Sequence, residues 1–375
     1  MNKNILRFLS DYSLKPIGKD SPFNEIDGMV FAIFSYAPTG NEWPEHICNF
    51  RAEPLNKTMG GLSEALIDVK SNSLLSTRFG SSITGDFGQH FRFFKHIAKN
   101  PRYKDIKITG FRFSNIGYCQ FCAFTFEIGN GEYVIAYRGT DGSPESWYES
   151  YKMFSSDILS HKLAKKHFQE QLAKSGGTYR LVGHSKGGNL AISAAVLSGT
   201  RQKLSIRSII NYDGPGFTMD FLYKHYKSIL LIQHKTYRFS PEDALVSTLF
   251  FGDKVLYYRQ NIKYIKSYGL QIPPSQHLYF NWSLNEFNKF DFAPQSKFSK
   301  YFQKYMRTLL LSHSCEEISN AFESAFALSF EMYAQTGYIL TYLEIASIFV
   351  DIGIKLESAK RQSNSHCIQY VKAIN

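Results

Sequence analysis

The stretch TYRLVGHSKGGNLAISAA, at residues 178–195, constrains the fold more than any other part of this chain. A run of β-branched and aromatic residues, typical of a strand, ends at GHSKGG, and an alanine-rich segment that favours a helix follows it. Ser185 lies between Gly183 and Gly187 in the pattern G-x-S-x-G, in which a serine occupies a strained strand-to-helix turn. The stretch therefore predicts a strand, a sharp turn that lifts the Ser185 hydroxyl above a sheet, and a helix. The alternative is an ordinary turn with a surface serine.

The surrounding segments alternate between strand-like and helical patterns. Strand-like runs occupy residues 104–114, 120–139, 206–217, 230–241 and 254–260, and the turn Gly129-Asn130-Gly131 within the second run is a hairpin signal. Residues 155–175 carry leucines near helical spacing, and Gly176–Gly177 ends that helix. This alternation predicts an α/β fold: a mainly parallel sheet with helices on both faces.

Three parts follow from this pattern. We expect residues 1–105 to form a mostly helical segment that packs on the core, residues 106–290 to form the catalytic core, and residues 291–375 to form a helical C-terminal extension. The first part contains SPFNEIDGMVFAIFSYAP (21–38), a cap-like Ser-Pro followed by an apolar helical run. In the last part, residues 337–354 carry Glu344 and Asp351, so we expect a buried helix rather than a membrane span.

The cysteines and the distribution of charge indicate where in the cell the protein is found and which partners it binds. The five cysteines are odd in number and irregularly spaced, and no signal-peptide pattern is found, so we expect a reducing, cytoplasmic location. Cys119 and Cys122 lie three apart on a predicted strand, point to opposite faces, and form no zinc site. The net charge of +11 is scattered along the chain, and the densest basic stretches, 162–168 and 297–307, read as solvated helix faces. No nucleic-acid module is present, so no nucleic-acid partner is expected.

A nucleophilic serine needs a base, and the base needs an acid that orients it. Five histidines follow Ser185 in the chain: His225, His234, His277, His313 and His366. His277 lies in a loop after the last strand-like segments, which is where an αβ hydrolase delivers its base. Two acids remain open: Asp213, after the strand that follows the serine helix, and Asp243, after the next strand. The oxyanion donors are predicted to be the backbone N–H of Lys186 and the N–H, with the hydroxyl, of Thr140.

VIAYRGTDGSPESWYESY (134–151) together with LVGHSKGGNLA (181–191) resembles the class 3 (triacylglycerol) lipase group. The chain is most similar to a bacterial family of lipase-like αβ hydrolases with a PFNEID start, a GHSKGGNLA turn, a YDGPGF strand end and a QH…W segment. The resemblance covers residues 20–290 and implies an αβ-hydrolase fold with Ser185 as nucleophile, His277 as base, and Thr140 and Lys186 as oxyanion donors. Asp243 matches the lipase position with an offset of one residue, and Asp213 matches the acid of the closer family. The family has an acid three residues after the Trp, where this chain has Ser150 after Trp147.

These observations predict a serine hydrolase that cleaves carboxylic esters through an acyl-enzyme, with no metal or organic cofactor. The expected substrate is a small-molecule or lipid ester, and positive charge with abundant aromatic residues fits peripheral contact with an anionic membrane. An acyltransferase would use the same acyl-enzyme, so the sequence leaves that alternative open. A second alternative is an idle αβ-hydrolase scaffold that binds or regulates a partner.

Overall fold

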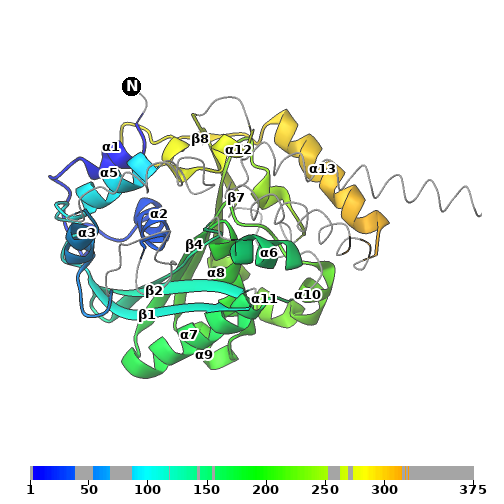
Figure 1. Ribbon diagram of the computed structural model, residues 1–375, viewed down its shortest axis with the longest axis horizontal. Helices are drawn as coiled ribbons and strands as arrows, with labels where there is room; N and C mark the ends of the chain where they lie inside the picture. The colour runs from blue at the N-terminus through cyan, green and yellow to red at the C-terminus, as the bar shows by residue number, and fades with distance from the viewer. Residues whose placement is uncertain are drawn as a thin grey trace, which may run out of the picture.

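The computed structural model describes residues 3–38, 54–67, 87–117, 119–141, 144–153, 157–251, 262–268 and 273–314, together with residues 317 and 320. The described part is built on one sheet of eight strands whose spatial order is the same as their order in the chain (Figure 1). The strands are β1 (Lys107–Ile116), β2 (Cys119–Gly129), β3 (Glu132–Tyr137), β4 (Thr178–His184), β5 (Ile206–Tyr212), β6 (Thr236–Pro241), β7 (Ile262–Ile265) and β8 (Phe292–Ala293).

The five central strands β3 to β7 run parallel to one another, and the pairs β1–β2, β2–β3 and β7–β8 towards the two edges are antiparallel. Parallel neighbours need crossover connections, and helices supply them between β3 and β4 and between β4 and β5. All carboxyl ends of the parallel strands therefore lie on the same edge of the sheet, where open α/β folds place their sites. The predicted αβ-hydrolase fold, a mainly parallel sheet with helices on both faces, is confirmed.

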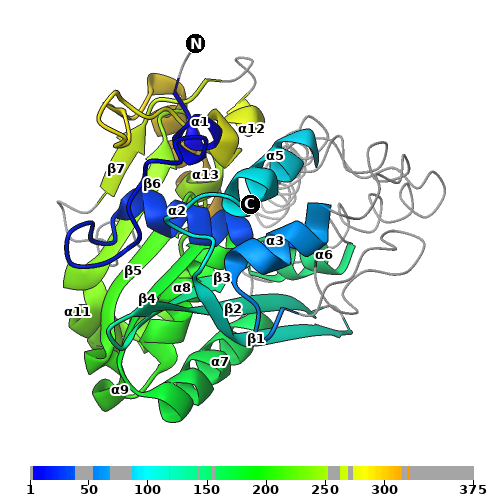
Figure 2. The ribbon, with the colours of Figure 1, turned by 90° about the vertical axis from the view of Figure 1, so that its left-hand side faces the viewer.

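Helices cover both faces of this sheet, as Figures 1 and 2 show. One face carries α2 against β3, β4 and β5, and the opposite face carries α7 and α8. The α-helices are α1 (Ile5–Leu9), α2 (Glu25–Phe34), α3 (Met59–Ile67), α5 (Phe87–Ile97), α6 (Pro144–Lys152), α7 (Leu159–Ser175), α8 (Lys186–Leu197), α9 (Thr200–Leu204), α10 (Met219–Lys224), α11 (Tyr226–Ile232), α12 (Pro273–Gln276) and α13 (Lys297–Ser312). Among the described residues there are also 3₁₀ turns at Gln233–Lys235, Val246–Thr248 and Tyr279–Asn281.

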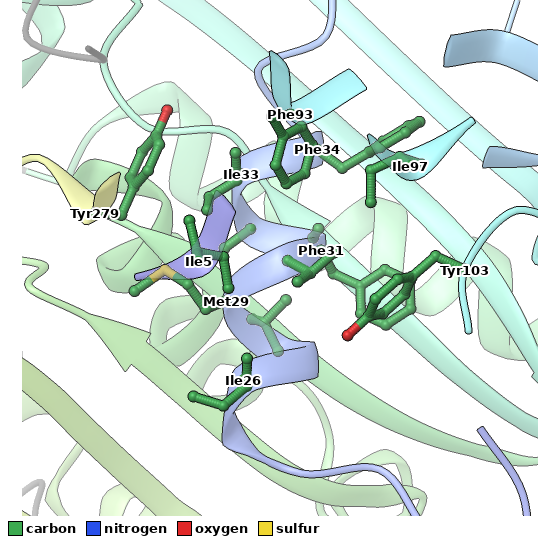
Figure 3. Close-up of a cluster of buried hydrophobic side chains, with 14 of the residues drawn as sticks. Ile5, Ile26, Met29, Phe31, Ile33, Phe34, Phe93, Ile97, Tyr103 and Tyr279 are labelled. Carbon is green, nitrogen blue, oxygen red and sulfur yellow. The ribbon is translucent and has the colours of Figure 1, made fainter. Parts of the chain in front are cut away.

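Helix α2 is the apolar centre of the N-terminal segment (Figure 3). The helix begins at Glu25, because the Asn24 side chain accepts from the N–H groups of Ile26 and Asp27, and Asp27 accepts from the N–H of Asn24. The start predicted at the earlier Ser-Pro pair is therefore three residues too early. Nearly every α2 side chain is buried, and Figure 3 shows Met29, Phe31 and Phe34 amid the side chains of α1 and α5.

The apolar core consists of two clusters, one on each face of the sheet, and side chains of β2 contribute to both. Cys119 belongs to the cluster under α7 and α8, and Cys122 belongs to the cluster under α2, so the two thiols point to opposite faces as predicted. The turn after β2 is also as predicted: Asn130 and Gly131 both have positive φ, 55° and 70°, which is the two-residue hairpin turn that matches strand twist. β2 and β3 therefore form an antiparallel hairpin, and β3 is the first strand of the parallel part of the sheet.

Some predicted segments lie outside the described residues. These are the strand-like run at 254–260, the apolar stretch at 337–354 and His366. Of the predicted C-terminal extension, the structure describes α13 and a few residues beside it. In the part of the chain that the structure describes, no helix has the length and apolar character needed to cross a membrane.

Candidate active site

Ser185 lies on the strained turn that the sequence predicts. Strand β4 ends at His184, α8 begins at Lys186, and Ser185 between them has φ 57° and ψ −134°. A residue with a side chain rarely adopts positive φ, and such strain is concentrated at functional sites. The Ser185 side chain makes no capping hydrogen bond to α8, although serine is a good capping residue. Its hydroxyl is therefore not used to begin the helix.

The flanking glycines are required by close packing. A Cβ added at Gly183 would overlap the backbone of Gly187, and a Cβ added at Gly187 would overlap the backbone of Tyr137 at the end of β3. Backbone cannot move aside as the end of a flexible side chain can, so both positions need glycine.

His277 and Asp213 form a buried pair. The Nδ1 atom of His277, just after α12, lies 2.6 Å from Oδ2 of Asp213, just after β5. Both residues are almost fully buried, with exposed fractions of 4% and 1%. A carboxylate only accepts, so Nδ1 carries the proton and donates it. The other ring nitrogen, Nε2, has no hydrogen-bond partner among the described residues and is the one left to accept a proton.

Asp243, the other acid that the sequence leaves open, contacts a neighbour of His277 instead. Its Oδ2 atom accepts from Nε2 of Gln276 at 2.6 Å. The backbone carbonyl of Gln276 accepts from the indole N–H of Trp282 at 2.8 Å. Asp213, and not Asp243, therefore contacts His277. Asp243 instead stabilises the loop that carries His277 through its hydrogen bond with Gln276.

A ring contact brings the serine turn and the histidine loop together. The imidazoles of His184 and His277 lie 4.4 Å apart between centroids, with 34° between their planes. The carbonyl of His277 also accepts from Nε2 of His184 at 2.9 Å. Ser185 directly follows His184 in the chain, so the serine and His277 belong to one buried cluster.

Lys186 directly follows Ser185, and the chain leading to Thr140 after β3 passes close to it. Thr140 follows Gly139, where an added Cβ would lie 3.0 Å from Cβ of Ser185. The backbone N–H groups of Thr140 and Lys186 donate to no described group, and the second of them is at the N-terminus of α8, where such groups lack helical acceptors. Both amides are therefore available to stabilise negative charge beside the serine.

The Thr140 hydroxyl differs from the expectation. Ser150 donates its only hydroxyl proton to the carbonyl of Ser146 at 2.8 Å, so Thr140 must donate to Ser150 across their 2.8 Å contact. Its proton is already used, which leaves the backbone N–H as the donor at this position.

Sequence reasoning missed a buried ion pair beside the serine. Nζ of Lys186 lies 2.9 Å from Oε2 of Glu149 and also donates to the Gln120 carbonyl at 2.9 Å. Burial alone would raise the pKa of Glu149, but the charge of Lys186 and hydrogen bonds from Ser160 and Lys186 outweigh burial and lower it. Glu149 lies two residues after Trp147, one position earlier than the family pattern, so a search of the adjacent positions could have found it.

This sheet and its strained serine turn define the class of the protein, which has an αβ-hydrolase fold. Residues 97–327, well over half of the chain, match the model of the Mbeg1-like family. The chain therefore belongs to the Mbeg1-like family.

Solved structures add distant similarities only. The chain is similar to a triacylglycerol lipase described as having a serine protease triad as its catalytic centre, with a TM-score of 0.31, 12% identity, and coverage of 64% of this chain and 77% of the lipase. It is similar to a fungal lipase in complex with an inhibitor, with a TM-score of 0.34, 11% identity and the same coverages, 64% and 77%. It is also similar to the Lip2 lipase of Yarrowia lipolytica, with a TM-score of 0.31, 10% identity, and coverages of 54% and 78%. No curated protein matches this chain. These similarities are too distant to carry a function over to it.

Proposed function

We propose that this protein is a serine hydrolase that cleaves carboxylic esters through an acyl-enzyme. The observation that carries the proposal is the 2.6 Å contact between His277 and Asp213, buried beside a serine with positive φ. An acid that holds Nδ1–H of an imidazole leaves Nε2 unprotonated, which is the state that a general base requires.

In this mechanism Ser185 Oγ attacks the ester carbonyl carbon while Nε2 of His277 accepts the hydroxyl proton. The carbonyl oxygen becomes an anion, and the N–H groups of Thr140 and Lys186 donate to it. The tetrahedral intermediate then expels the alcohol, which takes the proton from His277. Water attacks the acyl-enzyme in the same way, and the carboxylic acid leaves. Asp213 stays ionised and stabilises the imidazolium in both halves, and each oxyanion donor contributes about 10²–10³-fold to the rate.

Lipid acyl esters are the substrate class that we propose, with peripheral contact at an anionic membrane. The support is the net charge of +11 and the family resemblance, because a basic protein is attracted to anionic lipid surfaces. A cytoplasmic location is part of the proposal and is supported by the odd number and irregular spacing of the five cysteines. Water and an alcohol compete for the same acyl-enzyme, so adding a lipid alcohol to the assay separates hydrolysis from acyl transfer.

The experiment is labelling by a fluorophosphonate probe together with hydrolysis of p-nitrophenyl butyrate. We expect the wild type to be labelled and to turn over, and Ser185→Ala to lose both. Ser193→Ala is the matched control, because this buried serine of α8 donates only to the Leu190 carbonyl of its own helix. A folded wild type that is neither labelled nor active would refute the hydrolase and favour an idle scaffold that binds a partner.

A further inference from the structure

Tyr36, in the N-terminal segment, reaches the candidate active site through His184. The Tyr36 hydroxyl lies 3.1 Å from Nδ1 of His184, and Nε2 of His184 lies 2.9 Å from the backbone carbonyl of His277. The three residues come from distant parts of the chain and are all buried. Neither the hydrolytic mechanism nor the family pattern uses Tyr36 or the imidazole of His184.

The contacts determine which nitrogen of His184 carries the proton. A backbone carbonyl can only accept, so Nε2 must be the protonated nitrogen and must donate to His277. Nδ1 is then an acceptor, and the Tyr36 hydroxyl donates to it. The direction of both hydrogen bonds is therefore fixed, from Tyr36 to His184 and from His184 to the main chain of His277.

The surroundings of His184 keep this imidazole neutral. Burial lowers the pKa of His184 far below its ordinary value, and a positive charge on His277 or His90 lowers it further when either ring is protonated. Tyr279 packs edge-on against the ring at 4.8 Å, and His277 lies against it at 4.4 Å. When His277 becomes cationic during turnover, His184 therefore stays neutral and keeps its hydrogen bond to the carbonyl.

The backbone around Tyr36 is held by Arg138, which follows β3 and precedes the proposed oxyanion donor Thr140. The Arg138 guanidinium donates to the carbonyls of Ser35 at 2.6 Å and Ala37 at 2.7 Å, the residues before and after Tyr36. Arg138 follows β3 and lies two residues before Thr140. Desolvation raises the pKa of the Tyr36 hydroxyl, so it stays protonated and remains a donor at every pH at which the protein works.

We propose that Tyr36 and His184 are positioning residues that hold the main chain of His277 where its Nε2 can reach Ser185. The inference deepens the proposed function and rests on it. Tyr36 donates to Nδ1 of His184 and so supports the tautomer that the His277 carbonyl requires, and His184 holds the His277 loop at its height above β4. A displacement of about 1 Å in a catalytic group can cost about 10²-fold in rate, which sets the scale of the expected effect.

The test compares His184→Phe, His184→Gln and Tyr36→Phe for ester hydrolysis, with turnover counted per serine labelled by the fluorophosphonate probe. We expect kcat to fall about 100-fold in His184→Phe and about 10-fold in Tyr36→Phe, with KM within about threefold of wild type. His184→Gln places an amide N–H near the position of Nε2, so we expect it to recover at least about tenfold of the loss. A residue with a merely structural role would lower the labelled fraction and leave kcat per labelled site unchanged.

A matched control and a spectroscopic arm complete the test. His167→Gln removes another fully buried histidine, one that pairs with Thr125 away from the serine, and should leave kcat per labelled site unchanged. ¹⁵N NMR of the histidine rings should show His184 as the Nε2–H tautomer in wild type, with a weaker preference for that tautomer in Tyr36→Phe, which lacks the donor to Nδ1.

Turnover within twofold of wild type in both His184→Phe and Tyr36→Phe would overturn the positioning role while the hydrolase stands, and so would an Nδ1–H tautomer in wild type. A folded wild type with neither label nor turnover would overturn the proposed function and this inference together.

Discussion

The pair of Lys186 and Glu149 allows a stability prediction with a magnitude. Lys186→Met keeps the length of the side chain, removes its charge, and leaves the Glu149 carboxylate buried; the two side chains are 1% and 4% exposed in the folded protein. Removing one partner of a buried ion pair costs about 3–5 kcal/mol. Ser160 still donates to Glu149 from its backbone N–H at 3.1 Å and its hydroxyl at 2.7 Å. We therefore expect a loss near the lower end, about 3 kcal/mol.

Thermal and urea unfolding of three proteins measure this: wild type, Lys186→Met, and Lys186→Met with Glu149→Gln. At about 2–4 °C per kcal/mol, the single variant should lose about 6–12 °C in Tm. The double variant should regain about 1–2 kcal/mol, because a neutral amide is cheaper to bury than an unpaired carboxylate. A single variant that loses less than about 1 kcal/mol, or a double variant no more stable than the single one, would refute the reasoning.

The same pair predicts a pH dependence. The pKa of Glu149 is lowered on folding from its ordinary value of 4.5, so the pair contributes its full stability above pH 4.5 and loses it as the pH falls through the lower folded pKa. In Lys186→Met the unpaired carboxyl can take up a proton instead. The stability difference between wild type and Lys186→Met should therefore shrink in acid, and a constant difference from pH 7 to pH 3 would contradict an electrostatic origin.

Three further outcomes are expected. Asp213→Asn should lower kcat about 10⁴-fold and Asp243→Asn less than about 10-fold, because only the first contacts His277; steady-state ester hydrolysis measures both, and the reverse order would contradict the assignment. Gly187→Ala should cost about 2–3 kcal/mol in thermal unfolding because its Cβ overlaps the backbone of β3, whereas Gly61→Ala in α3, whose Cβ would meet only Oγ1 of Thr58 at 3.4 Å, should be neutral or stabilising. Burial lowers the pKa of His167 from 6.5 to about 3, so below pH 6.5 the unfolded chain binds a proton at this residue and the folded protein does not. The free energy of unfolding should therefore fall as the pH drops below 6.5. In His167→Gln, the dependence of Tm on pH between about pH 8 and about pH 5 should be flatter than in wild type.

Local chemistry made much of the fold predictable. The strand and helix around Ser185, the hairpin at Asn130 and the helix that ends at Gly176 each depend on residues close in the chain, and each lies where the sequence places it. The start of α2 was missed because Ser-Pro resembles a cap, while the structure uses the reciprocal bonds of Asn24 and Asp27, three and six residues after Ser21. A local competition between two capping signals cannot be decided without knowing which side chains are buried.

The candidate site was predictable only in part, because long-range register decides it. Asp213 and Asp243 both follow parallel strands, and nothing in the residues themselves separates them. Strand β5 lies directly beside β4, the strand that ends at the serine turn, whereas β6 lies one strand further away. In that spatial order Asp213 contacts His277, whereas Asp243 accepts a hydrogen bond from Gln276.

The N-terminal segment contributes more to the site than its place before the catalytic core suggests. The family match begins at residue 97, yet α2 packs on the sheet beneath the serine turn and delivers Tyr36 to His184. Arg138 binds the backbone on both sides of Tyr36, so the end of β3, which leads to Thr140, and the turn after α2, which carries Tyr36, are fixed to each other. A serine, a histidine and an acid supply the chemistry, but the height of the histidine above the sheet depends on a side chain nearly 150 residues before the serine. Separating α2 from the sheet should therefore disturb His277 even when every residue of the catalytic core is intact.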